Sequence, residues 1–333
     1  MNIQKITNFE LTKRQNSYLL LIIFGGYIAF SSIELFHDEC SGYRNCYDFD
    51  RRMARLYVWD VSWLQNDFRH FVHMGLLVLS DQTFGNYKVL PLVSSVFILI
   101  ITYQLAFSIT KKRIGGIISL LIMMQSSIFL DYDTSVTYPS FWALFLMLSL
   151  YLTRTKYYLL SPFVFVLSVL AKSITALFLP GLLLFLLFDN NSKKKITLVS
   201  YFIVNSGIVL FLYLSNKINS FLLFNSVNYD QFILGFVSWI WKGFAHDQLT
   251  IVFLIVSTTI ILTKKIPNGK PILAFCYGII LTSPFLIGFS TYDVWPYRFV
   301  PLVCGISIMT ALIFTNMERW VSSFLGGPAK KHV

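Results

Sequence analysis

Residues 159–188 read LLSPFVFVLSVLAKSITALFLPGLLLFLLF, and this stretch decides how often the chain crosses a membrane. It carries a single charged side chain, Lys172, near its middle, with Pro180 beyond it. A membrane-spanning helix needs about 20 apolar residues, so the stretch is too long for one span. Short paired helices are tolerated where protein or a water-filled cavity surrounds their turn. We therefore expect a hairpin of two short helices that meet near Lys172.

Apolar stretches of span length occupy most of the remaining chain. They are residues 18–36, 89–109, 114–131, 138–152, 196–215, 249–263, 271–289 and 298–315. Hydrophobic residues make up 56% of the 333 and charged residues only 13%, whereas a soluble domain is roughly a quarter charged. The sequence therefore predicts an all-α polytopic membrane protein of about ten transmembrane helices, with one domain over 1–320 and a tail at 321–333.

The basic residues cluster in the turns between these stretches. The clusters are Lys5, Lys13 and Arg14; Lys111, Lys112 and Arg113; Arg154 and Lys156; Lys193, Lys194 and Lys195; Lys264, Lys265 and Lys270; and Arg319, Lys330 and Lys331. With the hairpin in place, all of them fall on one side, which then holds 17 basic and 3 acidic residues against 10 and 13 on the other. Cytoplasmic loops carry such an excess of Lys and Arg. We expect both termini in the cytoplasm and no nucleic-acid partner for the net charge of +11.

Two long segments, 37–88 and 216–248, are expected as loops on the outer face, whereas the inner loops are short. The first contains DFDRRMARLY at 48–57, whose helical spacing predicts an amphipathic helix on the membrane surface. Cys40 and Cys46 lie in the same loop and could form a disulfide in an oxidising compartment. The other two cysteines, Cys276 and Cys304, are expected to be packing residues within spans.

Carboxylates on the outer face are the candidate catalytic groups. Asp48 and Asp50 could supply a general base held near the bilayer, or could simply belong to a solvated surface helix. Asp131 and Asp133, in DYDTSVTYP, lie in the next outer turn. An Asp-x-Asp pair can hold a divalent ion, although capping a turn is a commoner role for aspartate.

Two cations at the outer ends of spans carry further alternatives. Lys172 either snorkels to the headgroups or binds a lipid phosphate. Arg298, in DVWPYRF, either anchors its span or grips a phosphate with its guanidinium. His246 and Asp247 are expected to be interfacial. The chain shows no serine-hydrolase order of Ser, His and Asp, no Gly-rich phosphate loop and no His/Cys cluster, so those enzyme classes lack support.

The order of these features resembles the GT-C membrane glycosyltransferases, particularly the branch of protein O-mannosyltransferases and aminoarabinose transferases. A first span leads into an acidic loop, then HMGLLVLSDQTFGNYKVLP (73–91), DYDTSVTYPSFWALFLMLSLYL (131–152), LSVLAKSITALFLPGLLLFLL (167–187) and YRFVPL (297–302). The resemblance covers most of the chain and implies a GT-C-like fold with a loop helix after the first span.

The resemblance also implies roles for particular residues. An acid of the first outer loop would act as base or bind the acceptor: Asp48 matches best, Asp50 is next, and Asp38 and Glu39 are alternatives. The donor phosphate would be bound by Lys172, Arg298 and Lys88, the last standing where the family usually has arginine. His73, in His-Met-Gly-Leu where the family has two prolines, would join Asp131 and Asp133 at an acceptor or metal site.

The expected function is that of an inverting glycosyltransferase, mannosyltransferase-like, working on the extracytoplasmic face of the cell membrane, or of the endoplasmic reticulum in a eukaryote. It would move a sugar from a polyprenyl-phosphate lipid to a hydroxyl of a protein, glycan or lipid. Either no cofactor or a divalent cation, Mg²⁺ or Mn²⁺, would assist. A non-catalytic subunit of a membrane complex and a lipid or solute transporter are the alternatives.

Overall fold

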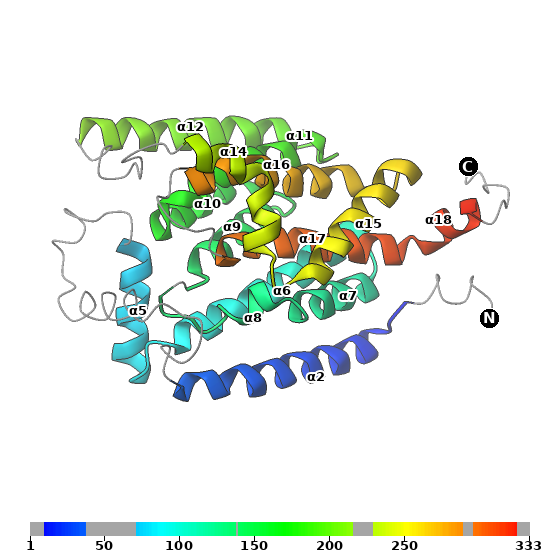
Figure 1. Cartoon of the computed structure of the whole chain (residues 1–333), viewed down its shortest axis with the longest axis horizontal. Helices are drawn as coiled ribbons and strands as arrows, with labels where there is room; N and C mark the ends of the chain where they lie inside the picture. The colour runs from blue at the N-terminus through cyan, green and yellow to red at the C-terminus, as the bar shows by residue number, and fades with distance from the viewer. Residues whose placement is uncertain (1–9, 38–70, 138, 216–228, 289–295, 325–333) are drawn as a thin grey trace.

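The computed structural model describes residues 10–37, 71–137, 139–215, 229–288 and 296–324, which form helices and no strand (Figure 1). The α-helices are α2 (Lys13–Ser31), α5 (Phe71–Phe84), α6 (Val89–Thr110), α7 (Arg113–Met124), α8 (Ser127–Leu130), α9 (Phe141–Leu152), α10 (Ser161–Ala171), α11 (Leu179–Phe188), α12 (Lys194–Leu214), α14 (Tyr229–Ser238), α15 (Gln248–Lys264), α16 (Gly269–Gly288), α17 (Val300–Thr315) and α18 (Met317–Phe324). Shorter 3-10 turns are η1 (Ser32–Phe36), η3 (Tyr158–Leu160), η4 (Ser173–Phe178) and η6 (Pro296–Phe299), and η5 (Trp239–Gly243) is a π-helix.

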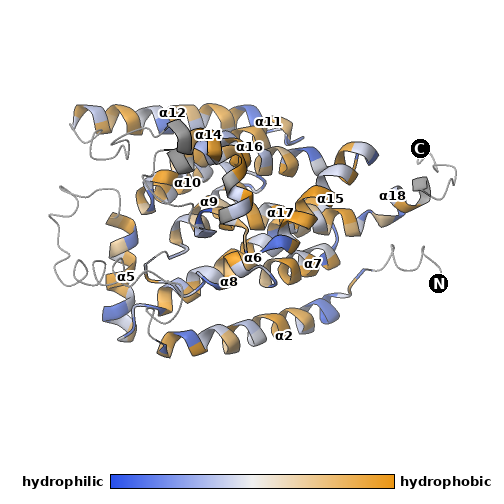
Figure 2. Cartoon of the chain, viewed as in Figure 1, coloured by the Kyte–Doolittle hydropathy of each residue, from blue (hydrophilic) through white to orange (hydrophobic). Residues whose placement is uncertain are grey.

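Four described segments are long and apolar enough to cross a membrane: Lys13–Phe36, Val89–Thr110, Lys194–Leu214 and Pro296–Thr315. They differ in burial, because α17 lies in the centre of the bundle against α6, α7, α15 and α16, whereas α2 and α12 present mostly uncovered apolar side chains (Figure 2). Uncovered apolar helices of this length are typical of proteins that contact lipid. The chain therefore has the helices of a membrane protein.

The stretch 159–188 folds as two helices separated by a break at Lys172. Ser168 Oγ of α10 donates to the Trp142 carbonyl near the start of α9 (2.5 Å), while Ser161 Oγ donates to the Ser149 carbonyl near its end (2.7 Å). After the break, α11 returns to the end of α9, where Asp189 binds Arg154. Lys172 has an extended backbone (φ −157°, ψ 112°) between α10 and η4. The chain therefore reverses direction at this residue.

Glycines allow α11, α16 and α14 to approach one another closely. A Cβ on Gly278 of α16 would overlap the backbone of Gly181 in α11, and one on Gly181 would meet the Phe275 carbonyl at 3.0 Å. On another face of α16, a Cβ on Gly235 of α14 would lie 2.5 Å from Pro284 Cα. Small residues give such contact between membrane helices, which lack a hydrophobic drive to associate within lipid.

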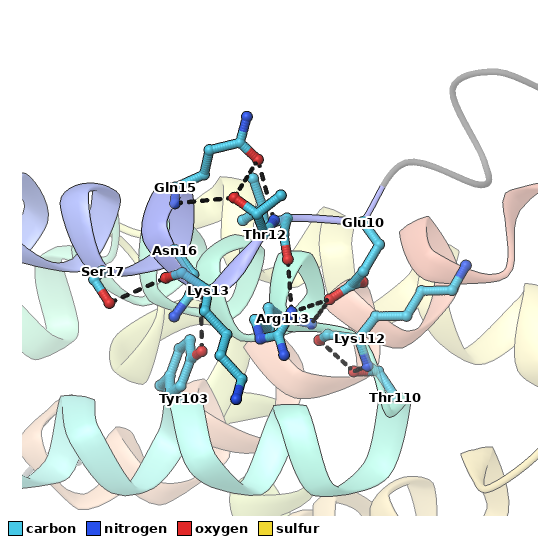
Figure 3. Close-up of polar contacts among 11 residues, drawn as sticks. Glu10, Thr12, Lys13, Gln15, Asn16, Ser17, Tyr103, Thr110, Lys112 and Arg113 are labelled. Atoms are coloured by element: carbon cyan, nitrogen blue, oxygen red, sulfur yellow. Dashed lines mark hydrogen bonds and ion pairs between the residues drawn. The ribbon is translucent and has the colours of Figure 1, made fainter.

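The first span docks through polar contacts near its two ends. The buried residues of α2 are Asn16, Tyr27 and Ser31. Asn16 Oδ1 accepts a hydrogen bond from Tyr103 of α6 (3.0 Å), beside the helix start, where Thr12 and Gln15 form a capping box (Figure 3). Polar side chains hold helices together in lipid where apolar contact does not discriminate between helix and solvent.

We call the two ends of the bundle the terminal end and the site end. At the terminal end, Arg113 binds Glu10, Lys112 Nζ donates to the Thr315 carbonyl (3.0 Å) and Asn268 donates to the Ile109 carbonyl (3.2 Å). These contacts join the described start of the chain to the turns after α6, α15 and α17 (Figure 1). Their basic clusters were expected to share one side, and these three turns do meet.

Two helices lie within segments expected to be loops. α5 occupies 71–84 and runs across the site end of the bundle rather than along it (Figure 1). α14 and η5 occupy 229–243; α14 packs on α16, and η5 contacts η6. The expected span 114–131 is also divided, since α7 ends at Met124 and α8 begins at Ser127. Residues 71–84 are apolar, but 14 residues are too few for a span. A search for apolar stretches of span length therefore did not identify helix α5.

Candidate functional site

Two cations meet on one phenol at the site end. Lys172 Nζ donates a 2.7 Å hydrogen bond to Tyr297 Oη and lies 4.0 Å from the ring centroid. Arg298 Nε approaches the same oxygen at 3.5 Å. Tyr297 and Arg298 are buried, and Lys172 is half-buried. We call Lys172 and Arg298 the cation pair, and Tyr297 is the tyrosine that they share.

Helix starts and breaks put these side chains in place. Lys172 stands where α10 stops, so its side chain is not committed to either helix face. Tyr297 and Arg298 belong to η6, directly before α17, whose first turn contains Pro301. Proline is accepted in a first turn because those backbone N–H groups have no partner within the helix. The same device starts α10 at Pro162 and α11 at Pro180.

The turn after α8 brings aspartates to the same end. Tyr132 packs edge-to-face on Tyr297, with ring centroids 5.7 Å apart. Its neighbour Asp133 is buried and accepts hydrogen bonds at Oδ2 from Tyr27 (2.8 Å) and Ser31 (2.6 Å) of α2. A continuous series of contacts therefore joins the first span to the cation pair.

The two members of the Asp-x-Asp pair have different surroundings. Asp131 is exposed, whereas Asp133 is buried and its backbone carbonyl also accepts from Ser95 Oγ (2.8 Å). The hydroxyl contacts give Asp133 a bracing role between α2, α6 and the turn. Within the described ranges, no three His, Cys, Asp or Glu side chains gather as a metal site would need.

Lys88 and His73 are both buried near this end. Lys88 Nζ donates to the carbonyls of His37 (2.6 Å) and Glu34 (3.0 Å), at the end of η1. A cation is favoured there because the carbonyls at a helix end carry partial negative charge. His73 of α5 packs edge-to-face on Phe141. Lys88 therefore holds the end of η1, while its predicted role in binding the donor phosphate stays a prediction.

The remaining expected site residues lie outside the described residues. These are the candidate bases Asp48 and Asp50, their alternatives Asp38 and Glu39, and the candidate disulfide of Cys40 and Cys46. Cys276 and Cys304 are described, free and buried, as expected for packing residues.

Sequence reasoning missed the residues that assemble the site. Tyr297, Tyr27 and Ser31 carry no charge and stand among apolar residues, so only their hydroxyls distinguished them. Asp247 was expected to be interfacial, yet it is buried: its carboxylate accepts from Ser126 and, at 2.6 Å, from Thr250 Oγ1. That carboxylate joins the start of α15 to the break between α7 and α8.

Comparison with protein-family models, with curated proteins and with solved structures gives no match. The arrangement is therefore interpreted from its own chemistry. Two like charges that share one oxygen atom repel each other, so their convergence on Tyr297 calls for a chemical reason. Guanidinium and ammonium groups together suit the oxygens of a phosphate.

Proposed function

We propose that this chain is an inverting glycosyltransferase that takes a sugar from a polyprenyl-phosphate lipid and transfers it to an acceptor hydroxyl outside the cytoplasm. The observation that carries the proposal is the convergence of Lys172 and Arg298 on Tyr297 Oη, at one end of a bundle of apolar helices. A lipid phosphate reaches such a site with its chain between helices and its headgroup at their ends. The resemblance to GT-C enzymes agrees with this donor.

The chemistry requires a base and a stabilised leaving group. A carboxylate of the first outer loop, Asp48 or Asp50 with Asp38 and Glu39 as alternatives, would remove the proton from the acceptor hydroxyl. The oxygen attacks the anomeric carbon in line as the carbon–oxygen bond to phosphate breaks, which inverts the configuration. Lys172 and Arg298 would stabilise the charge that develops on the departing polyprenyl phosphate.

Tyr297 would hold the two cations in position. Its hydroxyl accepts from both of them and its ring faces the Lys172 ammonium. Because repulsion between the cations falls when an anion binds, a phosphate would be preferred over a neutral ligand. Tyr132, which packs on the same ring, connects this arrangement to Asp131 and Asp133 on the acceptor side.

The decisive experiment is sugar transfer by the purified protein with radiolabelled polyprenyl-phosphate sugars, with and without chelator. Asp48→Asn, Asp50→Asn, Asp38→Asn and Glu39→Gln test the base, and Lys172→Ala tests the phosphate site. Lys193→Ala is the matched control, because this lysine lies at the far end of α11. We expect release of polyprenyl phosphate, abolished by one carboxylate variant and retained in Lys193→Ala. Loss with chelator would assign a divalent metal.

If a series of donors gives no turnover and no variant alters donor binding, the chain is a non-catalytic subunit or a transporter. The ten-span topology is part of the same proposal, since it puts Lys172 and Arg298 outside. A cysteine introduced at the exposed Ser192 should resist an impermeant thiol reagent applied outside. Labelling from outside would refute that topology while leaving a transfer result intact.

A further inference from the structure

The helix α14 and the π-helix η5 present an uncovered apolar face, although the sequence predicted a loop on the outer face for these residues. This face, here called the α14 face, consists of Ile233, Leu234, Phe236, Val237 and Trp241. Ile233 is 69% exposed and Trp241 75% exposed. Residues three and four positions apart share a side of a helix, and the pairs 233/236, 233/237, 234/237 and 237/241 have this spacing, so the five side chains form one surface.

The opposite side of α14 is fixed against α16. Gly235 lies directly on Pro284, Phe232 packs edge-to-face on Phe285 (5.0 Å), and Ser283 Oγ donates to the Gly235 carbonyl (3.2 Å). Replacing the hydrogen of Gly235 by a methyl would bring it within 2.5 Å of Pro284 Cα. The helix therefore cannot roll to bury the α14 face without losing this contact.

The helix on which α14 packs also presents exposed apolar side chains. Leu281 of α16 is 59% exposed, and Leu249 and Val252 of α15 are exposed as well. α15 and α16 are long apolar helices, coloured mostly as hydrophobic residues in Figure 2. An apolar surface shared with such helices is the kind that acyl chains cover.

We propose that α14 and η5 are embedded in the bilayer leaflet around the site end, with acyl chains covering the α14 face. Trp241 then lies at the level where indole rings accumulate, between headgroups and acyl chains. The proposal does not depend on the proposed function, because it rests on burial and packing alone.

The buried side of this segment connects lipid contact to the site. Trp239 packs on Phe244, which packs on Phe299 (ring centroids 5.8 and 5.6 Å apart), and a Cβ on Gly243 would meet the Phe299 ring at 2.7 Å. Phe299 follows Arg298 in η6. The segment proposed to lie in lipid therefore packs, through these aromatic rings, against the turn that carries Arg298.

The test uses bimane attached to single cysteines in full-length protein reconstituted into vesicles of phosphatidylcholine brominated on its acyl chains. Ile233→Cys and Phe236→Cys probe the α14 face. Ile255→Cys, exposed on α15, is the lipid-facing control, and Thr83→Cys, exposed in the polar end of α5, is the aqueous control. All four positions are exposed, so labelling removes no described core packing.

We expect brominated lipid to quench bimane at 233 and 236 as strongly as at 255, and severalfold more than at 83. Aqueous iodide should give the reverse order. Quenching at 233 and 236 that matches position 83 would place the α14 face in water and overturn the proposal. Protection from both quenchers would also overturn it, since the face would then be covered by protein. None of these outcomes depends on transferase activity.

Discussion

The two ends of the bundle use cations in opposite ways. At the terminal end, Arg154 Nη1 binds Asp189 Oδ1 at 3.0 Å, and Arg113 donates to the Glu10 carboxylate and the Leu11 carbonyl. Both of these arginines are paired with an acid, and their contacts connect helix ends. Such pairing indicates that these arginines stabilise the fold.

At the site end, Lys172 and Arg298 converge on the hydroxyl of Tyr297, and the nearby carboxylate of Asp133 accepts from two hydroxyls. Two cations therefore meet on one side-chain oxygen at this end. The clustered cations thus join turns of the bundle to one another, whereas the isolated cations at a helix break and a helix start meet on one tyrosine.

Removing a terminal-end partner should have the largest effect on stability. Arg154→Ala leaves the Asp189 carboxylate buried without its arginine, and breaking a buried ion pair costs about 3–5 kcal/mol. We expect a clear loss of thermal stability in detergent, with binding of polyprenyl phosphate per folded molecule unchanged. The Arg154→Ala, Asp189→Leu double variant should recover part of the loss, and Lys193→Ala is the control. If Arg154→Ala is as stable as the parent chain, the ion pair of Arg154 with Asp189 does not stabilise the fold.

Removing a site-end cation should instead affect ligand binding. A hydrogen bond to a charged group contributes about 1.5–3 kcal/mol, so Arg298→Ala should weaken binding of polyprenyl phosphate about 10- to 100-fold. Lys172→Ala should behave similarly, and thermal stability should change less than in Arg154→Ala. Isothermal titration with the lipid in detergent measures the affinity of both variants, and thermal unfolding in detergent measures their stability. If Arg298→Ala destabilises the fold and leaves affinity intact, the two ends do not differ as argued.

The contacts of Asp133 should have a smaller effect that shows whether bracing reaches the cation pair. Tyr27→Phe removes one of its two hydroxyl donors from α2, with an expected cost of about 1 kcal/mol. Tyr18→Phe is the control, because Tyr18 is exposed on the same helix and its hydroxyl accepts from Arg14 one turn earlier, not from another helix. We expect only Tyr27→Phe to lower thermal stability. A matching loss in both variants would mean that the effect of Tyr27→Phe does not depend on Asp133.

The smallest effect is expected at Glu10. Its carboxylate lies 3.9 Å from Arg113 Nη1 and both side chains are partly exposed. Exposed pairs contribute about 0–1 kcal/mol, so Glu10→Gln should leave stability within error at physiological salt. A large loss on thermal unfolding would show that the contacts in Figure 3 act as a unit.

Much of the fold could be predicted because helix length in a membrane is set by bilayer thickness. The expected spans 89–109, 196–215 and 249–263 correspond to α6, α12 and α15 within two residues at each end. α5 and α14 could not be found in this way. Each is shorter than a span, and each is helical because it packs on other helices, for example α14 through Gly235 on Pro284.

Part of the candidate site could be predicted, because a charged side chain within an apolar segment is energetically costly and therefore indicates a function. Lys172 and Arg298 stood out for that reason, and the structure brings them to one oxygen. The sequence could not indicate Tyr297 as that oxygen, because a tyrosine near a span end is ordinary. Nor could it separate Asp131 from Asp133, whose difference arises from Tyr27 and Ser31, about a hundred positions earlier.

The break at Lys172 leaves two helices that are each too short to cross a bilayer alone. The 11 residues of α10, at 1.5 Å each, extend about 17 Å, far short of the roughly 30 Å hydrocarbon layer. The second helix, α11, packs at Gly181 on Gly278 of α16, which is synthesised about a hundred residues later. A bulkier residue at 278 would therefore act during assembly of the chain, before any ligand is met, because α11 could not reach its place against α16.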